Sequence, residues 1–169
     1  GTSDYSTYIT NAQNQGCDVF FSPVSTEAAA QIIAKAAAQS LGMPILAGDT
    51  WDSNVILEAA KGTDVEICVT TFYQEGADEK FDASIKEWIS SDATALANNG
   101  GNDELAAVTA MGYDAYYVAL EALKAAGSTA PADVLKALPG VTYTGVTGAI
   151  AFNETGDANR TSAFVKRCN

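Results

Sequence analysis

Histidine is absent from this 169-residue chain, and lysine and arginine together number only 9, against 21 aspartates and glutamates. The missing histidine removes the commonest catalytic base and the commonest metal ligand. The net charge of −12 argues against a surface that binds nucleic acid or an anionic membrane. No apolar run approaches the ~20 residues that a membrane-spanning helix needs. No signal peptide is evident either.

Cysteine is also scarce, with only Cys17, Cys68 and Cys168. The number is odd and no two cysteines form a CxxC pair, so we expect neither a disulfide framework nor a zinc site. Cys17 and Cys68 stand beside or inside apolar stretches and are predicted to be small, buried hydrophobic side chains. We expect no metal and no cofactor.

The first 72 residues alternate between helical and strand patterns in a chain that is 47% hydrophobic, as a globular domain is. Apolar residues recur at helical spacing around 5–12, 27–40 and 54–60. Short apolar runs predict strands at 19–21, 44–47 and 65–72. This alternation predicts an α/β fold with a doubly wound, mostly parallel sheet.

Residues 74–140 contain no predicted strand. Their pattern predicts helices around 81–89, over 104–126 and from 131 to just before Pro139, with an Asn- and Gly-rich loop at 90–103. By its helical spacing, Trp88 is predicted to lie in a core. The long helix carries a predicted apolar stripe of Leu105, Val108, Gly112, Ala115, Tyr116, Ala119 and Leu123.

From residue 141 the pattern returns to strand. A hairpin is predicted from strand 145–152, a polar turn and strand 162–168, and the strand around Ile150 is expected beside the parallel sheet. Only three parallel strands precede it, whereas a doubly wound domain usually has five or six. The chain is therefore expected to be part of a larger protein.

Polar side chains follow two successive predicted strands. Ser22, Ser25 and Thr26 follow the first strand, and the run from Asp49 through Trp51 to Asp52 follows the second. Loops diverge and helix N-termini converge at the carboxyl edge of a parallel sheet, which is where ligands bind. A carboxylate, hydroxyls and an indole at one edge predict a site for a small polar ligand.

Each of these residues also has an ordinary structural interpretation. Asp49 could cap a helix or form an Asx-turn, although Asp52 or Ser53 is the better candidate for the cap. Ser25 and Thr26 suit helix N-caps, which remain compatible with ligand contact because the helix start faces the cleft. Trp51 could form a pocket wall or pack locally.

Four segments carry a resemblance to a known family. They are DYSTYITNAQNQGCDVFFSPVSTEAAAQIIAKAAAQSLGMPILAGDTWDS, VEICVTTFY, MGYDAYYVALEAL with its GYDA element, and GVTGAIAFNETGD. In this order they resemble the C-terminal half of type 1 periplasmic binding proteins, and within them the Leu/Ile/Val receptors of ABC importers. In that family two α/β lobes close over the ligand, and the chain crosses between them three times.

The resemblance implies a division of the chain. Residues 1–73 and 145–169 would belong to the second lobe, and the helical block 74–144 would contribute to the first lobe, most of whose sheet would lie in a missing N-terminal half. Helical faces around Trp88, Tyr116, Leu120 and Leu123 would then form an exposed apolar patch.

The resemblance also assigns ligand contacts. Asp49 would hold the α-ammonium of the ligand, and Val108 would approach a hydrophobic contact of the first lobe. An aromatic residue often stands where this chain has Ser25, so a preference for branched aliphatic ligands does not carry over.

These implications predict a fragment of an extracytoplasmic solute-binding receptor, in the periplasm or as a cell-surface lipoprotein. Its expected partners are a small-molecule ligand such as an amino acid, an ABC transporter permease, and either the missing N-terminal half or a second copy. We expect no nucleic-acid partner. The alternative is a sensory ligand-binding domain of a signalling receptor. No GxSxG, Walker or GxGxxG motif is present, so we do not expect an enzyme.

Overall fold

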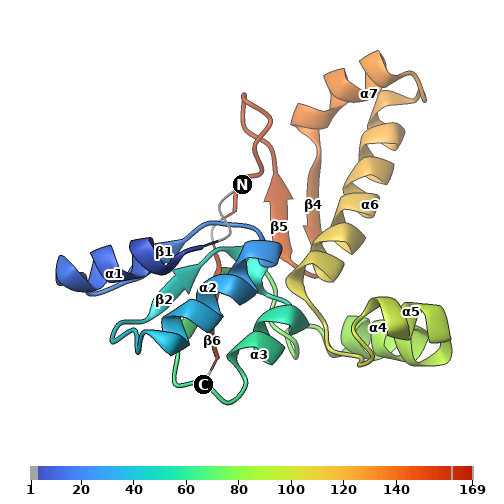
Figure 1. Cartoon of the computed structure of the whole chain (residues 1–169). Helices are drawn as coiled ribbons and strands as arrows, with labels where there is room; N and C mark the ends of the chain where they lie inside the picture. The colour runs from blue at the N-terminus through green and yellow to red at the C-terminus, as the bar shows by residue number, and fades with distance from the viewer. Residues whose placement is uncertain (1–3, 161, 169) are drawn as a thin grey trace. The chain divides into compact units, whose positions relative to one another are not determined.

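The computed structural model describes residues 4–160 and 162–168, which form two compact units (Figure 1). Unit 1 comprises Gly1–Thr71 and Phe164–Asn169, and unit 2 comprises Phe72–Ala163. The chain therefore changes unit after Thr71 and after Ala163, whereas the sequence suggested changes after residues 73 and 144.

Unit 1 is built around a four-stranded sheet in the order β1-β2-β3-β6. The strands are β1 (Phe20–Ser22), β2 (Ile45–Ala47), β3 (Ile67–Thr71) and β6 (Phe164–Cys168). The first three run parallel, and β6 is antiparallel to β3. The predicted α/β fold with a mostly parallel sheet is confirmed, and the three predicted parallel strands each begin within two residues of their expected start.

Three helices accompany this sheet: α1 (Ser6–Asn14), α2 (Thr26–Ala38) and α3 (Asn54–Ala60). The apolar stripe of α2 is buried as its spacing predicts, and it joins the alternate buried residues of β2 and β3 in one core. The central members of this core are Ala29, Ile32, Ile33, Ala36, Ile45, Ala47, Ile67 and Val69. Small alanines on α2 allow close packing against the strands.

Unit 2 contains the helices α4 (Glu79–Ser91), α5 (Ala93–Asn98), α6 (Ala107–Ala126) and α7 (Pro131–Ala137), followed by a 3-10 turn at Leu138–Gly140 and the strands β4 (Thr142–Gly145) and β5 (Gly148–Ala151). The two strands form a separate antiparallel pair. One core cluster gathers around Tyr73 and Phe81, and a second around Val118 and Ile150. The N-terminal part of α6 contributes to the first cluster and its C-terminal part to the second, so this helix connects the two clusters.

The predicted hairpin is wrong in its pairing. Ile150 lies in β5, which pairs with β4 and not with the parallel sheet, and residues 164–168 pair with β3. A two-residue connection, Val146 and Thr147, joins β4 to β5, and Gly148 after it has a φ of 95°. This connection lacks the Asn-Gly signal of a tight hairpin, so the run from 145 to 152 resembled one strand.

Three further predictions are corrected in the structure. The expected loop at 90–103 contains α5, because the Asp92 carboxylate accepts hydrogen bonds from the amides of Thr94 and Ala95 at 2.8 Å and caps the helix start. Trp88 is 59% exposed and not in a core. Cys17 is exposed, because it lies in the connection between α1 and β1 and outside the strand.

The apolar stripe predicted for the long helix also faces away from the core, apart from Leu105, which precedes α6 and is buried. The buried residues of this helix are Ala107, Ala110, Asp114, Val118 and Ala122, whereas Val108 and Tyr116 are 71% and 66% exposed. The sequence presents apolar side chains on both faces of α6, and the core takes the face with the smaller ones. In the described part of the chain, no helix is long and apolar enough to cross a membrane.

Candidate functional site

The two polar loops predicted from the sequence meet in unit 1. They follow β1 and β2, which are parallel neighbours, with Ser22 paired to Ala47 at their carboxyl ends. The Thr26 hydroxyl donates a hydrogen bond to the Thr50 carbonyl oxygen at 2.6 Å, and the Trp51 indole donates one to the Val24 carbonyl oxygen at 2.9 Å. These cross-links hold both loops at one edge of the sheet.

Asp49 carries an unpaired charge at this edge. It is exposed and begins a 3-10 turn, Asp49–Trp51, whose N-cap residue is Gly48. Within the described residues, no group donates a hydrogen bond to its carboxylate, and no cation lies within ion-pairing distance of it. Its side chain therefore does not serve as a helix cap. An exposed, unpaired carboxylate is available to a cationic ligand group.

Asp52, three residues later, is fully engaged. Both of its carboxylate oxygens lie 2.9 Å from the Lys166 ammonium, and one accepts a hydrogen bond from the Thr71 hydroxyl at 2.7 Å. Its side chain is only 12% exposed. Ser53 holds the N-cap position of α3 but makes no side-chain capping bond, so the predicted cap by Ser53 is not found. Two nearby aspartates thus differ in availability.

The remaining candidates in unit 1 differ in how accessible they are. Ser25 occupies the N-cap position of α2, is exposed, and makes no side-chain capping bond. Ser22 is 2% exposed and Trp51 is 1% exposed. Trp51 belongs to the core of unit 1, which favours its local-packing interpretation over a pocket wall. Asp49, Ser25 and the Thr26 hydroxyl are the polar groups best placed at the edge.

Val108 is the sixth predicted contact, and it belongs to unit 2. It lies in the first turn of α6 and is 71% exposed. The other five predicted contacts all belong to unit 1.

A buried carboxylate in unit 2 was not anticipated as a structural anchor, although it belongs to the GYDA element. Asp114 is fully buried and accepts hydrogen bonds from the Val146 amide at 2.9 Å and from the amide and hydroxyl of Thr147 at 2.8 and 2.5 Å. Arg160 donates to the Thr147 hydroxyl at 2.9 Å and stacks 5.2 Å above the Phe72 ring. The GYDA aspartate thus holds the β4–β5 connection against α6.

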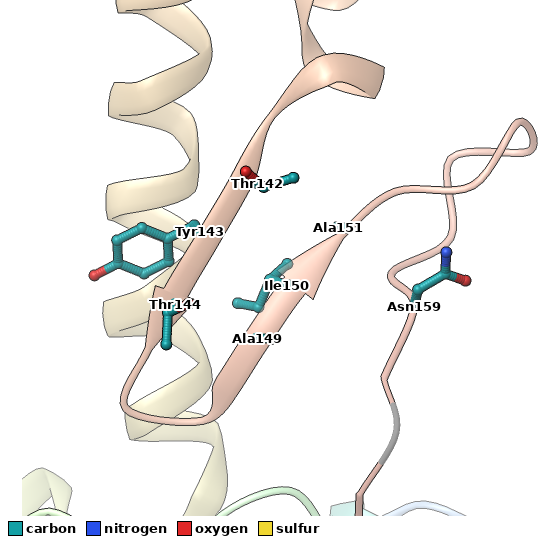
Figure 2. A pocket seen from close by; sticks show the side chains of 7 residues that line it. All are labelled: Thr142, Tyr143, Thr144, Ala149, Ile150, Ala151 and Asn159. Atoms are coloured by element: carbon teal, nitrogen blue, oxygen red, sulfur yellow. The ribbon is translucent and has the colours of Figure 1, made fainter.

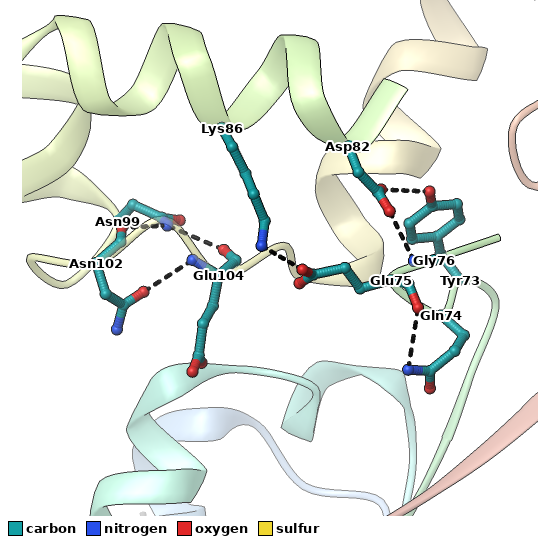
Figure 3. Close-up of polar contacts among 9 residues, drawn as sticks. All are labelled: Tyr73, Gln74, Glu75, Gly76, Asp82, Lys86, Asn99, Asn102 and Glu104. Atoms are coloured by element: carbon teal, nitrogen blue, oxygen red, sulfur yellow. Dashed lines mark hydrogen bonds and ion pairs between the residues drawn. The ribbon is translucent and has the colours of Figure 1, made fainter. Parts of the chain in front are cut away.

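A second polar group lies at the start of unit 2 (Figure 3). The Tyr73 hydroxyl donates to Asp82 at 2.5 Å, and the same carboxylate accepts from the Gly76 amide at 2.6 Å. Burial, followed by the bond to Asp82, raises the pKa of Tyr73. Lys86 forms an ion pair with Glu75 across the same segment. These contacts bind residues 73–76 to α4 and leave no unpaired charge there for a ligand.

A pocket of about 220 Å³ lies on the β4–β5 pair (Figure 2). Its lining residues are Thr142, Tyr143, Thr144, Ala149, Ile150, Ala151 and Asn159. None of them is charged, so the pocket offers no counter-charge to an ammonium or a carboxylate group. In the described residues, no cluster of three acidic or cysteine side chains is placed to hold a metal ion.

Comparisons with known proteins agree with this architecture. The family model described as periplasmic binding protein matches residues 1–168. A leucine-binding protein from Thermotoga maritima superposes with a TM-score of 0.80 at 27% identity, over 98% of this chain and 45% of its own. A search of curated proteins gives no match.

Two other solved structures share the fold at lower identity. A branched-chain amino-acid transporter substrate-binding protein from Streptococcus pneumoniae, in complex with isoleucine, has a TM-score of 0.68 at 17% identity over 99% of this chain and 49% of its own. A solute-binding protein of an ABC transporter from R. palustris, in complex with benzoate, has a TM-score of 0.75 at 14% identity over 99% and 44%. The chain spans less than half the length of each of these three proteins. Because the periplasmic binding protein model matches residues 1–168, the chain belongs to that family.

Proposed function

We propose that this chain is part of an extracytoplasmic solute-binding receptor, in the periplasm or anchored to the cell surface, that captures an amino acid or a similar small polar ligand for an ABC importer. The observation that carries the proposal is the exposed, unpaired Asp49 carboxylate beside two cross-linked loops at the carboxyl edge of parallel strands. Family membership and likeness to leucine- and isoleucine-binding proteins support it.

In this proposal the Asp49 carboxylate pairs with the ligand's ammonium. The acidic loop at the carboxyl end of β2 favours a cationic ligand group, and a charge-assisted hydrogen bond to a carboxylate is roughly twice as strong as a neutral one. Ser25 and Thr26 lie at the start of α2, where hydroxyl and amide groups can bind further polar atoms of the ligand. We assign unit 1 to the second lobe of the receptor and unit 2 to part of the first lobe.

The test uses the receptor expressed at the full length of its gene. Binding of L-leucine and L-isoleucine is measured by titration calorimetry for the wild type, Asp49→Asn and Asp49→Ala. Losing the partner of a desolvated ammonium costs about 2 kcal/mol or more, which corresponds to a loss of affinity of about 30-fold or more. Asp18→Asn is the matched control, because this exposed aspartate precedes β1 at the opposite edge of the same sheet.

A ligand analogue separates the ammonium from the rest of the molecule. 4-Methylpentanoate has the carboxylate and side chain of leucine but no ammonium, so the wild type should bind it far more weakly than leucine. Asp49→Asn should narrow that difference. Unchanged leucine affinity in Asp49→Ala would refute the role of Asp49, and a receptor that binds benzoate but no amino acid would overturn the ligand class.

A further inference from the structure

The last strand of unit 1 brings a lysine to the inner side of the sheet. In β6, Lys166 is paired with Val69 of β3, and cross-strand partners project from the same face. Val69 is buried in the core of unit 1, and Lys166 is itself only 24% exposed. A lysine in this position needs an anionic partner, because a partly buried charge without one is costly.

Asp52 supplies that partner and also binds the end of β3. Its carboxylate joins Lys166 of β6 to the hydroxyl of Thr71, a residue that is 1% exposed. One carboxylate thus connects the polar loop after β2 to the end of β3 and the middle of β6. The ion pair spans 114 positions in the sequence, so it forms only when β6 has joined the sheet.

The turn that carries Asp49 is short and closed by backbone hydrogen bonds. The Trp51 amide donates to the Gly48 carbonyl at 3.1 Å, the Asp52 amide to the Asp49 carbonyl at 3.0 Å, and the Ser53 amide to the Trp51 carbonyl at 2.9 Å. The Asp52 amide is hydrogen-bonded to the Asp49 carbonyl oxygen. A contact that fixes the Asp52 side chain therefore also fixes the backbone that presents the Asp49 carboxylate.

We propose that Asp52, clamped by Lys166 and Thr71, is a positioning residue that fixes the 48–52 turn and so aims the Asp49 carboxylate at the ligand. The expected effect of Asp52 on ligand binding rests on the proposed function. Its expected effect on the 48–52 turn does not. Lys166 has a second consequence, since its ion pair with Asp52 occupies that carboxylate and leaves the Asp49 carboxylate available to a cationic group.

The chain contains a close control for this ion pair. Arg167 is the next residue on β6 and pairs with Glu66, just before β3, at 3.2 Å, with side chains 58% and 41% exposed. Arg167→Met and Lys166→Met therefore remove a cation from adjacent positions of one strand, and only Lys166→Met removes the ion pair of Asp52. Asp52→Asn and Thr71→Val alter the other two side chains that take part in these contacts.

The first measurement needs no ligand. Amide hydrogen exchange at Trp51, Asp52 and Ser53 is followed in the full-length, ligand-free receptor. We expect exchange about 10-fold faster or more in Lys166→Met and Asp52→Asn, as for a locally opened turn. Arg167→Met should match the wild type, and Lys166→Arg should restore most of the protection. Equal exchange in Lys166→Met and Arg167→Met would overturn the proposal, even if Asp52→Asn failed to fold.

The second measurement is the affinity for L-leucine. Lys166→Met should lose about 10-fold in affinity while Arg167→Met loses none, with rescue by Lys166→Arg. If the turn opens in Lys166→Met but leucine affinity does not fall, the positioning role toward the ligand is overturned. If the wild type binds no amino acid while the exchange effect is present, the proposed function fails and the clamp on the turn stands.

Discussion

Replacing Asp114 with alanine should destabilise unit 2 more than any other change to a single charged group there. The carboxylate is fully buried and accepts three hydrogen bonds from Val146 and Thr147, the two residues that connect β4 to β5. It also approaches Gly145 so closely that a Cβ at that position would lie 2.1 Å from its Oδ1 atom. The β4–β5 connection has therefore been shaped around this side chain.

The expected magnitude follows from the bonds that would be lost. A hydrogen bond to a charged group contributes about 1.5–3 kcal/mol, and a buried donor left without a partner costs about 1–3 kcal/mol. The three bonds share one carboxylate and are not additive. We therefore expect Asp114→Ala to lower the free energy of unfolding of unit 2 by about 3–5 kcal/mol. Asp114→Asn keeps one acceptor oxygen and should cost less.

Native-state amide exchange in β4 and β5 measures this loss within unit 2. Tyr143 and Ile150 are opposite one another in the strand pair and serve as reporters. Asp133→Ala is the control, because this exposed aspartate lies in the first turn of α7 and its removal should cost about 0.5 kcal/mol or less. If Asp114→Ala and Asp133→Ala gave the same opening free energy, the anchoring role of Asp114 would be refuted.

Three further outcomes are expected. A hydrogen bond with Tyr117, followed by partial burial, raises the pKa of Tyr113 to about 12, whereas an unfolded tyrosine ionises near pH 10. The contribution of Tyr113 to stability is therefore present below about pH 10 and lost as the pH rises towards 12. In urea unfolding, Tyr113→Phe should make the free energy of unfolding depend less on pH across that range. Gly145→Ala should mimic part of the Asp114→Ala loss by displacing that carboxylate, and wild-type exchange rates would contradict this. The 169-residue chain alone should form a dimer or larger complex in size exclusion and solution scattering; Trp88→Ser should weaken it and Tyr8→Ser, on α1 in unit 1, should not.

Local patterns predicted most of the helices and all three parallel strands, because burial there follows the period of the sequence. The predictions failed where a distant partner decides the structure. Residues 164–168 become the antiparallel edge strand β6 only by pairing with β3, about a hundred positions earlier in the chain. The connection at Val146 and Thr147 is a tight turn because Asp114, more than 30 positions away, accepts its amide hydrogens.

The same distinction applies to the candidate site. Asp49, Ser25 and Thr26 follow successive parallel strands, so their shared sheet edge was predictable from topology alone. Their relative availability was not predictable, because it depends on Lys166. Asp49 and Asp52 are equivalent in a local sequence window, and only the return of β6 selects Asp52 as the paired carboxylate. The one cue was the pair of basic residues, Lys166 and Arg167, in an otherwise apolar strand.

The exposed face of α6 connects the fold to the length of the related proteins. A helix with apolar side chains all round is normally buried on all sides, yet α6 buries only its smaller residues and leaves Val108, Tyr116 and Leu123 exposed. Trp88 on α4 is exposed as well. The related structures are about twice as long as this chain. An exposed apolar face of this kind favours self-association of the isolated chain, as the size-exclusion prediction expects. Because association between copies is intermolecular, it should weaken on dilution, and a monomer at every protein concentration would contradict it.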